Sequence, residues 1–464
     1  MESNASWHHL INHHMKKKLI VLCLVLVGQH ACLPTCQAQG GPEGAPLQIT
    51  PAITHTLIDS LGQVLYNHYI FPDTARKWAA YLEAQYKKGA YAGIKDPNDL
   101  ADRLQQDLQK AHHDGHFRLL YAPGLARDLA DTTHMAERHR VGDSLQLINL
   151  RWRNFTFTKA EILPGNIGYV KFNGFVGYLD EARPTITGAF RFVANTKAII
   201  IDLRDNGGGS PAMVSQIESY FFPVKTHMND IIDRKNGTEV FWTDPAKADS
   251  VYLQQPVYIL TSHHTFSGAE DFSYGMQAVH RGVIVGDTTG GGAHPVGPVP
   301  VALGFVANIP FARTLNPYTH TDWEGTGVIP DVPAHSEDAL EAAKKAFFTK
   351  LSQTAATGPE KAQAQWQLDD LLGRSSPETR NPASLTPYIG TYQGGLVFYT
   401  DQSGFYCRNA ERGNQIFKLI PISNDKFILD ENVHVEFTKD DKGNVSGIDM
   451  WWTDGQRSHK PKEK

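Results

Sequence analysis

The sequence contains little cysteine and no excess of basic charge. Four cysteines occur among 464 residues, and three of them, Cys23, Cys32 and Cys36, lie close to the N-terminus. If the N-terminal segment is removed, Cys407 remains alone, so no internal disulfide is expected and the fold must rely on its core. The formal net charge is -5. No basic field is therefore available to attract nucleic acid or an anionic membrane by charge.

A leader segment is expected at residues 1–38. The stretch MKKKLIVLCLVLVGQHACLPTCQAQG begins at Met15, continues with an apolar run and reaches a small residue at Ala38. This is the layout of a secretory signal peptide, so we expect Met15 to be the true start. Cleavage near Ala38 would export the chain to the periplasm or the cell exterior. A membrane anchor is disfavoured because a span needs about 20 apolar residues. A lipid anchor on Cys32 or Cys36 is a further alternative, although the residues before each fit a lipoprotein cleavage site poorly.

The rest of the chain is long enough for two or three domains, and its 41% hydrophobic and 20% charged residues are typical of a globular protein. No internal repeat is visible. We expect an α/β fold made of four consecutive parts. In chain order they are an N-terminal helical bundle (48–125), a central mainly parallel α/β core (126–356), a helix and linker (357–384) and a small C-terminal β domain (385–464).

Apolar periodicity supports this division. Helical spacing runs from about residue 48 to 112, with turns at Pro72 and at KDPND. Between about 145 and 340, apolar runs such as KAIIIDLR and PVYILTS alternate with helical segments. Fully apolar strands of this kind are typical of a mainly parallel sheet that is buried on both faces.

The C-terminal part shows a different pattern. After the linker RSSPETRNPASLTP, short alternating strands separated by Gly, Asn and Asp turns predict a β domain. Cys407 lies in the alternating stretch GFYCRN and is interpreted as a packed strand residue. Trp451 and Trp452 could bind a ligand or fill the core of this domain, and the core is the favoured interpretation.

Ser267 stands where the strand PVYILTS gives way to a helix. In SGAEDFSYGMQAVH, the apolar residues Ala269, Phe272, Met276 and Val279 fall on one helical face. Serine is a preferred N-cap residue and needs no catalytic role at such a position. The same position also suits a nucleophile, because the free N–H groups of a helix start can bind an oxyanion.

A second strand-to-helix junction, IIIDLRDNGGGSP, carries Gly207, Gly208 and Gly209. Glycine allows the backbone to come close to a substrate. A tight turn or a phosphate cradle would be the alternatives, but neither the spaced glycines of dinucleotide binders nor the lysine of a P-loop is present. Two such junctions at one edge of a sheet favour an acyl-transfer site there.

Several histidines could serve as the base. His263 and His264 are close to Ser267 in sequence, but successive strand residues point to opposite faces, which makes them poor candidates. His116 in HHDGHFRLLY follows a helix and opens a strand-like run. A structural histidine and a zinc site formed with His112 are the alternatives. Gly115 argues against the continuous helix that such a zinc site would need.

Five motifs, TSHHTFSGAEDF, IDLRDNGGG, DGHFRL, LPGNIGYVKFNGF and WEGTGVIPDV, together resemble the S41 serine peptidase family in its tricorn-core and interphotoreceptor-retinoid-binding-protein-like branch, over about residues 50 to 345. The resemblance implies a ClpP/crotonase-like core. It places the nucleophile at Ser267, the general base at His116 and the relay carboxylate at Glu324. By the same resemblance, Gly208 and Gly268 present the oxyanion-hole N–H groups.

The sequence departs from related patterns in three places. Carboxy-terminal processing peptidases use a Ser/Lys pair, but the corresponding turn here reads TTGGGAHP and has no lysine. They also carry a PDZ domain, for which the interval between His116 and NIGYVKF is too short. Both differences favour the His-dependent branch. Gly115 stands where tricorn-type enzymes have a serine that assists the relay.

The sequence therefore predicts an exported serine peptidase that acts on peptides or unfolded proteins through an acyl-enzyme, without cofactor or metal. Membrane contact is expected only through a lipid anchor, and no oligomeric state is predicted. A binding protein on the same fold, which would hold peptides or apolar ligands without turnover, is one alternative. An esterase is another, although the G-x-S-x-G elbow of α/β-hydrolases is absent around Ser267.

Overall fold

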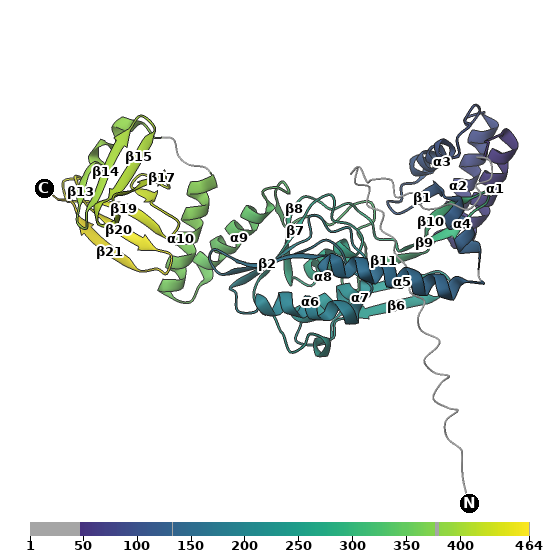
Figure 1. The fold of residues 1–464 in the computed structure, drawn as a ribbon, viewed down its shortest axis with the longest axis horizontal. Coiled ribbons are helices and arrows are strands. Elements are labelled where there is room, and N and C mark those ends of the chain that lie inside the picture. Colours follow the sequence, from purple (N-terminus) through teal and green to yellow (C-terminus); the bar gives the residue numbers. More distant parts are fainter. Residues whose placement is uncertain (1–46, 132, 376–379, 464) are drawn as a thin grey trace, which may run out of the picture.

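The computed structural model describes residues 47–131, 133–375 and 380–463. The expected leader, including Met15, Ala38 and the three N-terminal cysteines, lies outside the described residues. Within the described ranges, no helix is both long and apolar enough to cross a bilayer. Three parts follow one another along the long axis of the molecule: N-terminal helices, a central sheet with its helices, and the C-terminal strands (Figure 1).

The N-terminal part is built on the helices α1 (Pro51–His68), α2 (Pro72–Lys87) and α3 (Pro97–Ala111). Each begins with proline, whose fixed φ suits the first turn, and the side chains of Thr50 and Asp96 cap α1 and α3. The predicted helices are confirmed. Their apolar core is completed by a later segment, because Phe305, Ala307 and Ile309 of β10 (Phe305–Pro310) are buried in it.

Strand β10 lies at the centre of a small antiparallel sheet. It pairs with β1 (Arg118–Tyr121) on one side and with β9 (Val296–Pro300) on the other. Strand β1 follows the His116 motif directly. This long-range pairing therefore joins the N-terminal helices to a segment about 180 residues further along the chain. The predicted division into parts 48–125 and 126–356 did not anticipate this contact.

The central sheet has six strands in the order β12 (Val332–Pro333), β8 (Gly282–Gly286), β7 (Val257–Thr261), β4 (Ala198–Asp202), β3 (Ile167–Phe172) and β2 (Phe157–Leu163). All neighbours are parallel except β2 and β3. Every residue of β4 and β7 is buried. The predicted mainly parallel, doubly covered sheet is confirmed, with one antiparallel strand at its edge.

Helices cover both faces of this sheet. One apolar cluster joins it to α6 (Leu179–Phe192), α7 (Pro211–Glu218) and α8 (Gly268–Ala278). A second cluster joins the opposite face to α9 (Ala339–Thr354) and α10 (Gly358–Ser375). Alternate residues of β4 enter different clusters: Ile199 and Ile201 face α6 to α8, whereas Ala198 and Ile200 face α9 and α10.

Several elements were not expected from the sequence. They are the helices α4 (Pro123–Ala130) and α5 (Met135–Trp152), the short helices η1 (Asn154–Thr156), η2 (Ser219–Phe221) and η3 (Pro245–Lys247), and the strands β5 (His227–Asp233) and β6 (Gly237–Trp242). Strand β5 also pairs with β11 (Ala312–Leu315), which completes an antiparallel sheet of three strands. Helix α5 runs along the central part (Figure 1). Its only strongly buried apolar side chain in the core is Leu150, among those described, and exposed apolar residues such as Leu145 and Ile148 obscure its periodicity.

The C-terminal part consists of two antiparallel sheets, which confirms the β prediction. One sheet holds β13 (Gly390–Tyr392), β14 (Leu396–Asp401), β15 (Gly404–Asn409) and β16 (Gln415–Lys418). The other holds β17 (Ile420–Pro421), β18 (Lys426–Ile428), β19 (Val433–Lys439), β20 (Val445–Trp452) and β21 (Arg457–Pro461). The short helices η4 (Pro382–Tyr388) and η5 (Ala410–Arg412) accompany them.

The single residues predicted for this part can be located. Cys407 is a fully buried residue of β15 and is not in a disulfide, so its interpretation as a packed strand residue is confirmed. Trp452 packs against the apolar cluster of the domain. Two cations lie near the half-buried ring of Trp451, with Arg457 Cζ 3.3 Å and Lys426 Nζ 4.3 Å from its centroid. The core interpretation is therefore confirmed for Trp452, whereas for Trp451 it stays a prediction.

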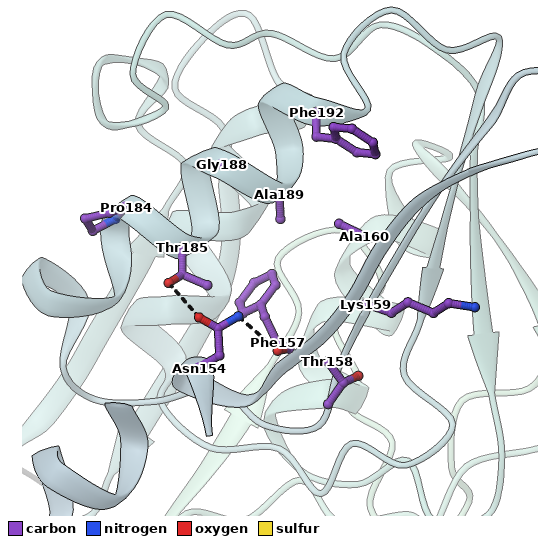
Figure 2. A pocket seen from close by; sticks show the side chains of 10 residues that line it. All are labelled: Asn154, Phe157, Thr158, Lys159, Ala160, Pro184, Thr185, Gly188, Ala189 and Phe192. Atoms are coloured by element: carbon purple, nitrogen blue, oxygen red, sulfur yellow. Dashed lines mark hydrogen bonds between the residues drawn. The ribbon is translucent and has the colours of Figure 1, made fainter. Parts of the chain in front are cut away.

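A surface pocket of about 440 Å³ lies between β2 and α6. Figure 2 shows its lining, with Thr158, Lys159 and Ala160 on the strand and Thr185, Ala189 and Phe192 on the helix. None of the residues predicted for catalysis lines it.

Candidate active site

Ser267 occupies the sharp turn between β7 and α8. It is the N-cap residue of α8, as predicted, and its backbone has φ 52° and ψ -120°. A residue with a side chain rarely adopts positive φ, and such strain is found where the surrounding structure holds a functional group in place. The turn also leaves the N–H of Gly268, the first helical residue, outside the hydrogen-bonded ladder of the helix.

The glycine turn at 207–209 lies directly against this serine. A Cβ atom on Gly208, where φ is +93°, would lie 2.5 Å from the nitrogen of Gly268 and 2.8 Å from Cβ of Ser267. Only glycine fits at this approach. The structure therefore brings together the two junctions that the sequence singled out.

The backbone N–H groups of the turn 207–209 and of Gly268 differ in whether they already donate a hydrogen bond within the protein. The N–H of Gly208 donates to Oδ1 of Asn206 at 2.8 Å. In the part of the chain that the structure describes, the N–H groups of Gly209 and Gly268 have no hydrogen-bond acceptor. Gly209 was not singled out for this role, yet its N–H is the freer donor in the turn. The assignment of Gly208 to an oxyanion hole stays a prediction.

His116 reaches the same place from the N-terminal part. Its ring packs on Phe266, the residue before Ser267, with 4.6 Å between ring centroids. Among the described residues, its buried Nδ1 has no hydrogen-bond partner, and no hydrogen bond joins the ring to Ser267. Burial lowers the pKa of His116 to about 4, although the negative charge of Asp114 opposes that effect. The imidazole is therefore neutral at pH 7 and able to accept a proton.

Glu324 lies beside the backbone that carries His116. One carboxylate oxygen accepts from the N–H of Gly115 at 3.4 Å and the other from the N–H of Ala293 at 2.6 Å. The second oxygen is also 3.6 Å from Nδ1 of His294. Burial raises the pKa of Glu324, and the charge of His294 partly offsets this shift. The contacts of Glu324 with the histidine segment thus run through the Gly115 peptide.

Asp114 and His294 were not predicted as site residues. The buried carboxylate of Asp114 accepts from the N–H of His116 at 3.0 Å, from the hydroxyl of Tyr69 at 2.9 Å and from Nδ1 of His294 at 2.9 Å. Burial alone would raise the pKa of Asp114, but the bonds from His294 and Tyr69 outweigh it and the pKa is lowered. The pKa of His294 is raised despite its burial, chiefly by its bond to Asp114.

The same network is the best-placed candidate for a metal in the described chain. Ligand atoms of Asp114, His294 and Glu324 lie within 4.8 Å of one another. A second set, His55, Asp59 and Glu83, lies on α1 and α2 at the surface. In the first set, His294 already forms ion pairs with both carboxylates. The sequence held a signal for this network, since a histidine follows the glycine turn in TTGGGAHP.

His263 and His264 lie on the exposed side of the serine turn. Their rings contact each other, with centroids 3.9 Å apart, and within the described residues neither hydrogen bonds to Ser267. Their interpretation as bystanders stays a prediction.

Comparison with known proteins agrees with the resemblance noted in the sequence. The model of peptidase family S41 matches residues 166–334, and the model of the N-terminal domain of Peptidase_S41 in eukaryotic IRBP matches residues 48–141. A curated relative, carboxyl-terminal-processing peptidase 2, chloroplastic, of Arabidopsis thaliana, is 28% identical over 181 residues. The match covers 37% of this chain and only 33% of that relative.

Solved structures are more distant. The crystal structure of a Parabacteroides merdae protein is 20% identical, with a TM-score of 0.46, and the match covers 66% of this chain and 98% of that chain. The photosystem II D1 C-terminal processing protease is 16% identical, with a TM-score of 0.39, over 61% of this chain and 94% of its own. The two family models do not overlap and together match more than half of the 464 residues, so the chain belongs to peptidase family S41.

Proposed function

We propose that this chain is a serine peptidase that hydrolyses peptide bonds through an acyl-enzyme on Ser267. The observation that carries the proposal is the backbone of Ser267: a strained N-cap residue, packed against the turn 207–209, next to two N–H groups without acceptors in the described chain. A serine held in this way can attack an acyl group while the N–H groups bind the oxyanion.

In the proposed reaction, His116 accepts the proton of the Ser267 hydroxyl as Oγ attacks the scissile carbonyl carbon. The N–H of Gly268 and one N–H of the glycine turn stabilise the negative oxygen. The imidazolium then gives its proton to the leaving amine, and a water molecule deprotonated by His116 resolves the ester. The nearby carboxylate of Asp114 favours the imidazolium electrostatically, and Glu324 holds the peptide before His116.

Two features support the His-dependent branch of the family. The match to the IRBP-type N-terminal domain spans residues 48–141 and includes His116. The turn that follows β8, residues 287–295, contains no lysine that could serve a Ser/Lys pair. We therefore assign the base to His116 rather than to a lysine.

The proposed substrates are peptides and unfolded or partly degraded chains, cut near their C-termini. The name of the Arabidopsis thaliana relative, a carboxyl-terminal-processing peptidase, agrees with this choice. We further propose that the chain is exported and cleaved near Ala38, because residues 15–38 have the layout of a signal peptide.

The test compares wild-type protein with Ser267→Ala and His116→Ala, each checked for folding by circular dichroism. We expect both variants to lose cleavage of a peptide library, and fluorophosphonate labelling to depend on Ser267. Labelling should also fall strongly in His116→Ala. Full activity in both variants would show that the site is misassigned.

The second candidate is a binding protein that holds peptides or apolar ligands without turnover. It is favoured by one observation, that no hydrogen bond joins His116 to Ser267 among the described residues. Binding of peptides by the wild type with neither labelling nor cleavage would support it. Hydrolysis of esters but not of peptides would instead indicate an esterase.

A further inference from the structure

A buried carboxylate behind the catalytic turn has no role in the proposed reaction so far. Glu270 is fully buried three residues after Ser267, in the first turn of α8. We infer that Glu270 is a positioning residue, which locks the Ser267 turn to the glycine turn 290–292 and so fixes the nucleophile relative to His116. The inference rests on the proposed function and deepens it.

The carboxylate is fully used by four donors. Its Oε2 accepts from the N–H of Ser267 at 2.9 Å and from the N–H of Gly292 at 2.8 Å. Its Oε1 accepts from the N–H of Gly291 at 2.7 Å and from the hydroxyl of Thr289 at 2.5 Å. Only the first of these bonds belongs to an ordinary capping box. The other three bind a segment that starts almost 20 residues later in the chain.

That segment forms the surface on which the histidine rests. A Cβ atom on Gly292 would lie 2.6 Å from Cε1 of His116 and 2.2 Å from Cζ of Phe266. The glycine turn therefore touches the ring of the proposed base and the residue before the nucleophile. Because Glu270 holds both the N–H of Ser267 and that of Gly292, one rigid carboxylate determines the spacing between the two catalytic groups.

The same connection extends to the relay carboxylate. The carbonyl oxygen of Gly291 accepts from the N–H of Gly325 at 3.0 Å, next to Glu324. The hydroxyl of Thr289 accepts from the N–H of Val328 at 2.7 Å while it donates to Glu270. Glu270 thus binds the Ser267 turn and the turn beneath His116 directly, and it is linked to the Glu324 segment through Thr289 and Gly291.

The experiment uses the full chain with Glu270→Gln, which keeps the shape of the side chain but turns an NH₂ group toward N–H donors. Asp271→Asn is the matched control, because Asp271 is the next residue of the same helix turn, is buried beside Glu218 and Asn229, and has no side-chain hydrogen bond to the glycine turn among the described residues. We measure the rate of fluorophosphonate labelling, kcat and KM for a peptide ester, and thermal unfolding.

We expect Glu270→Gln to lower kcat and the labelling rate about 100-fold, as misplacement of a reacting group by about 1 Å does. KM should change less than about threefold, since the residue does not touch substrate. Asp271→Asn should stay within about threefold of wild type in both rates. A folded Glu270→Gln protein with wild-type labelling and kcat would overturn the inference.

A second pair of variants decides the matter if Glu270→Gln does not fold. Thr289→Val removes one donor to Glu270, whereas Thr289→Ser keeps the hydroxyl. The inference requires Thr289→Ser to label at least about tenfold faster than Thr289→Val, and equal rates contradict it. If the wild type itself is not labelled at Ser267, the proposed function fails and the inference fails with it. If the wild type is labelled at Ser267 and the variants are labelled at the same rate, only the inference about Glu270 is contradicted and the proposed function stands.

Discussion

At the scale of single residues, Gly115 is the position at which the proposed site departs from the tricorn-type pattern, which has a serine there. A Cβ atom at Gly115 would lie 3.4 Å from Cζ of Phe266 and 3.5 Å from the carbonyl oxygen of Gly291. These are ordinary contact distances, so a small side chain fits. The N–H of the same residue already faces Glu324. A hydroxyl at this position would therefore stand next to the carboxylate of Glu324.

We predict that Gly115→Ser folds with wild-type stability within about 1 kcal/mol and labels with fluorophosphonate at least as fast as wild type. A gain of a few-fold is expected because the added hydroxyl can orient the Glu324 carboxylate toward the histidine segment. Gly115→Ala is the control, since it adds the same Cβ without the hydroxyl. Equal rates for the serine and alanine variants would show that the hydroxyl has no role here.

The pH dependence of activity provides a second test at this scale. Burial lowers the pKa of His116 to about 4, so the neutral base should persist well below pH 6.5. We predict that the acid limb of kcat/KM that His116 controls, measured with an uncharged ester substrate, has its midpoint near pH 4. Burial also raises the pKa of Glu270 to about 7. An acid limb near 6.5 that is retained in Glu270→Gln would therefore mean that His116 is solvated or is not the base.

At the scale of elements, helix α8 buries an acidic pair behind the site. Both carboxylate oxygens of Glu218 on α7 lack hydrogen-bond partners among the described residues. Burial, and then the neighbouring Asp271, raise the pKa of Glu218 well above its usual value. Burial raises the pKa of Asp271 to about 7. The pair therefore holds more protons in the folded protein than in the unfolded chain between about pH 4 and pH 7.

Stability should consequently fall as pH rises through that window, because the native state then loses protons that it binds more tightly than the unfolded state. Between pH 5 and pH 8 the free energy of unfolding of the wild type should fall. We predict that in Glu218→Gln it falls by at least about 1 kcal/mol less, since one pKa unit corresponds to about 1.4 kcal/mol. Denaturant titrations at both pH values measure it. The exposed Glu431→Gln is the control, and an identical pH response in all three proteins would exclude a buried acidic pair.

At the scale of the whole molecule, the site depends on how the N-terminal helices meet the central part. His116 arrives from one and Ser267 from the other. Arg234, in the turn between β5 and β6, donates to the carbonyl oxygens of Tyr66, Asn67 and Tyr69 at the end of α1. One guanidinium therefore binds the end of α1, where unpaired carbonyl groups accept hydrogen bonds from a cation well.

We predict that Arg234→Met weakens this junction by about 0.5–1.5 kcal/mol. Hydrogen exchange in α1 should accelerate, and kcat/KM should fall because the His116 segment loses its fixed position. Lys235→Met, at the exposed neighbouring position, is the control. Unchanged exchange in α1 with Arg234→Met would show that β10 alone holds the N-terminal part.

Much of the fold could be predicted because its signals are local. The apolar runs that became β4 and β7 and the proline-led starts of α1 to α3 are features of a few neighbouring residues. Helix α5 was missed because its apolar residues are largely exposed, and the hairpin of β5 and β6 was missed because most of its residues are exposed or half-buried. The pairing of β5 with β11, about 80 residues later, depends on which segments the folded chain brings together.

The sequence by itself determined that Ser267 begins a helix, that a glycine turn opens the next element after β4, and that a strand follows His116. A cap residue, a glycine and an apolar run act over a few positions, so their effects can be predicted locally. Only the tertiary structure decided that the N–H of Gly209 has no acceptor within the described chain, that Asp114 binds His294 180 residues away, and that Glu270 holds the turn 290–292. Such contacts join segments that are remote in the chain, and their geometry is fixed by the packing of the whole core.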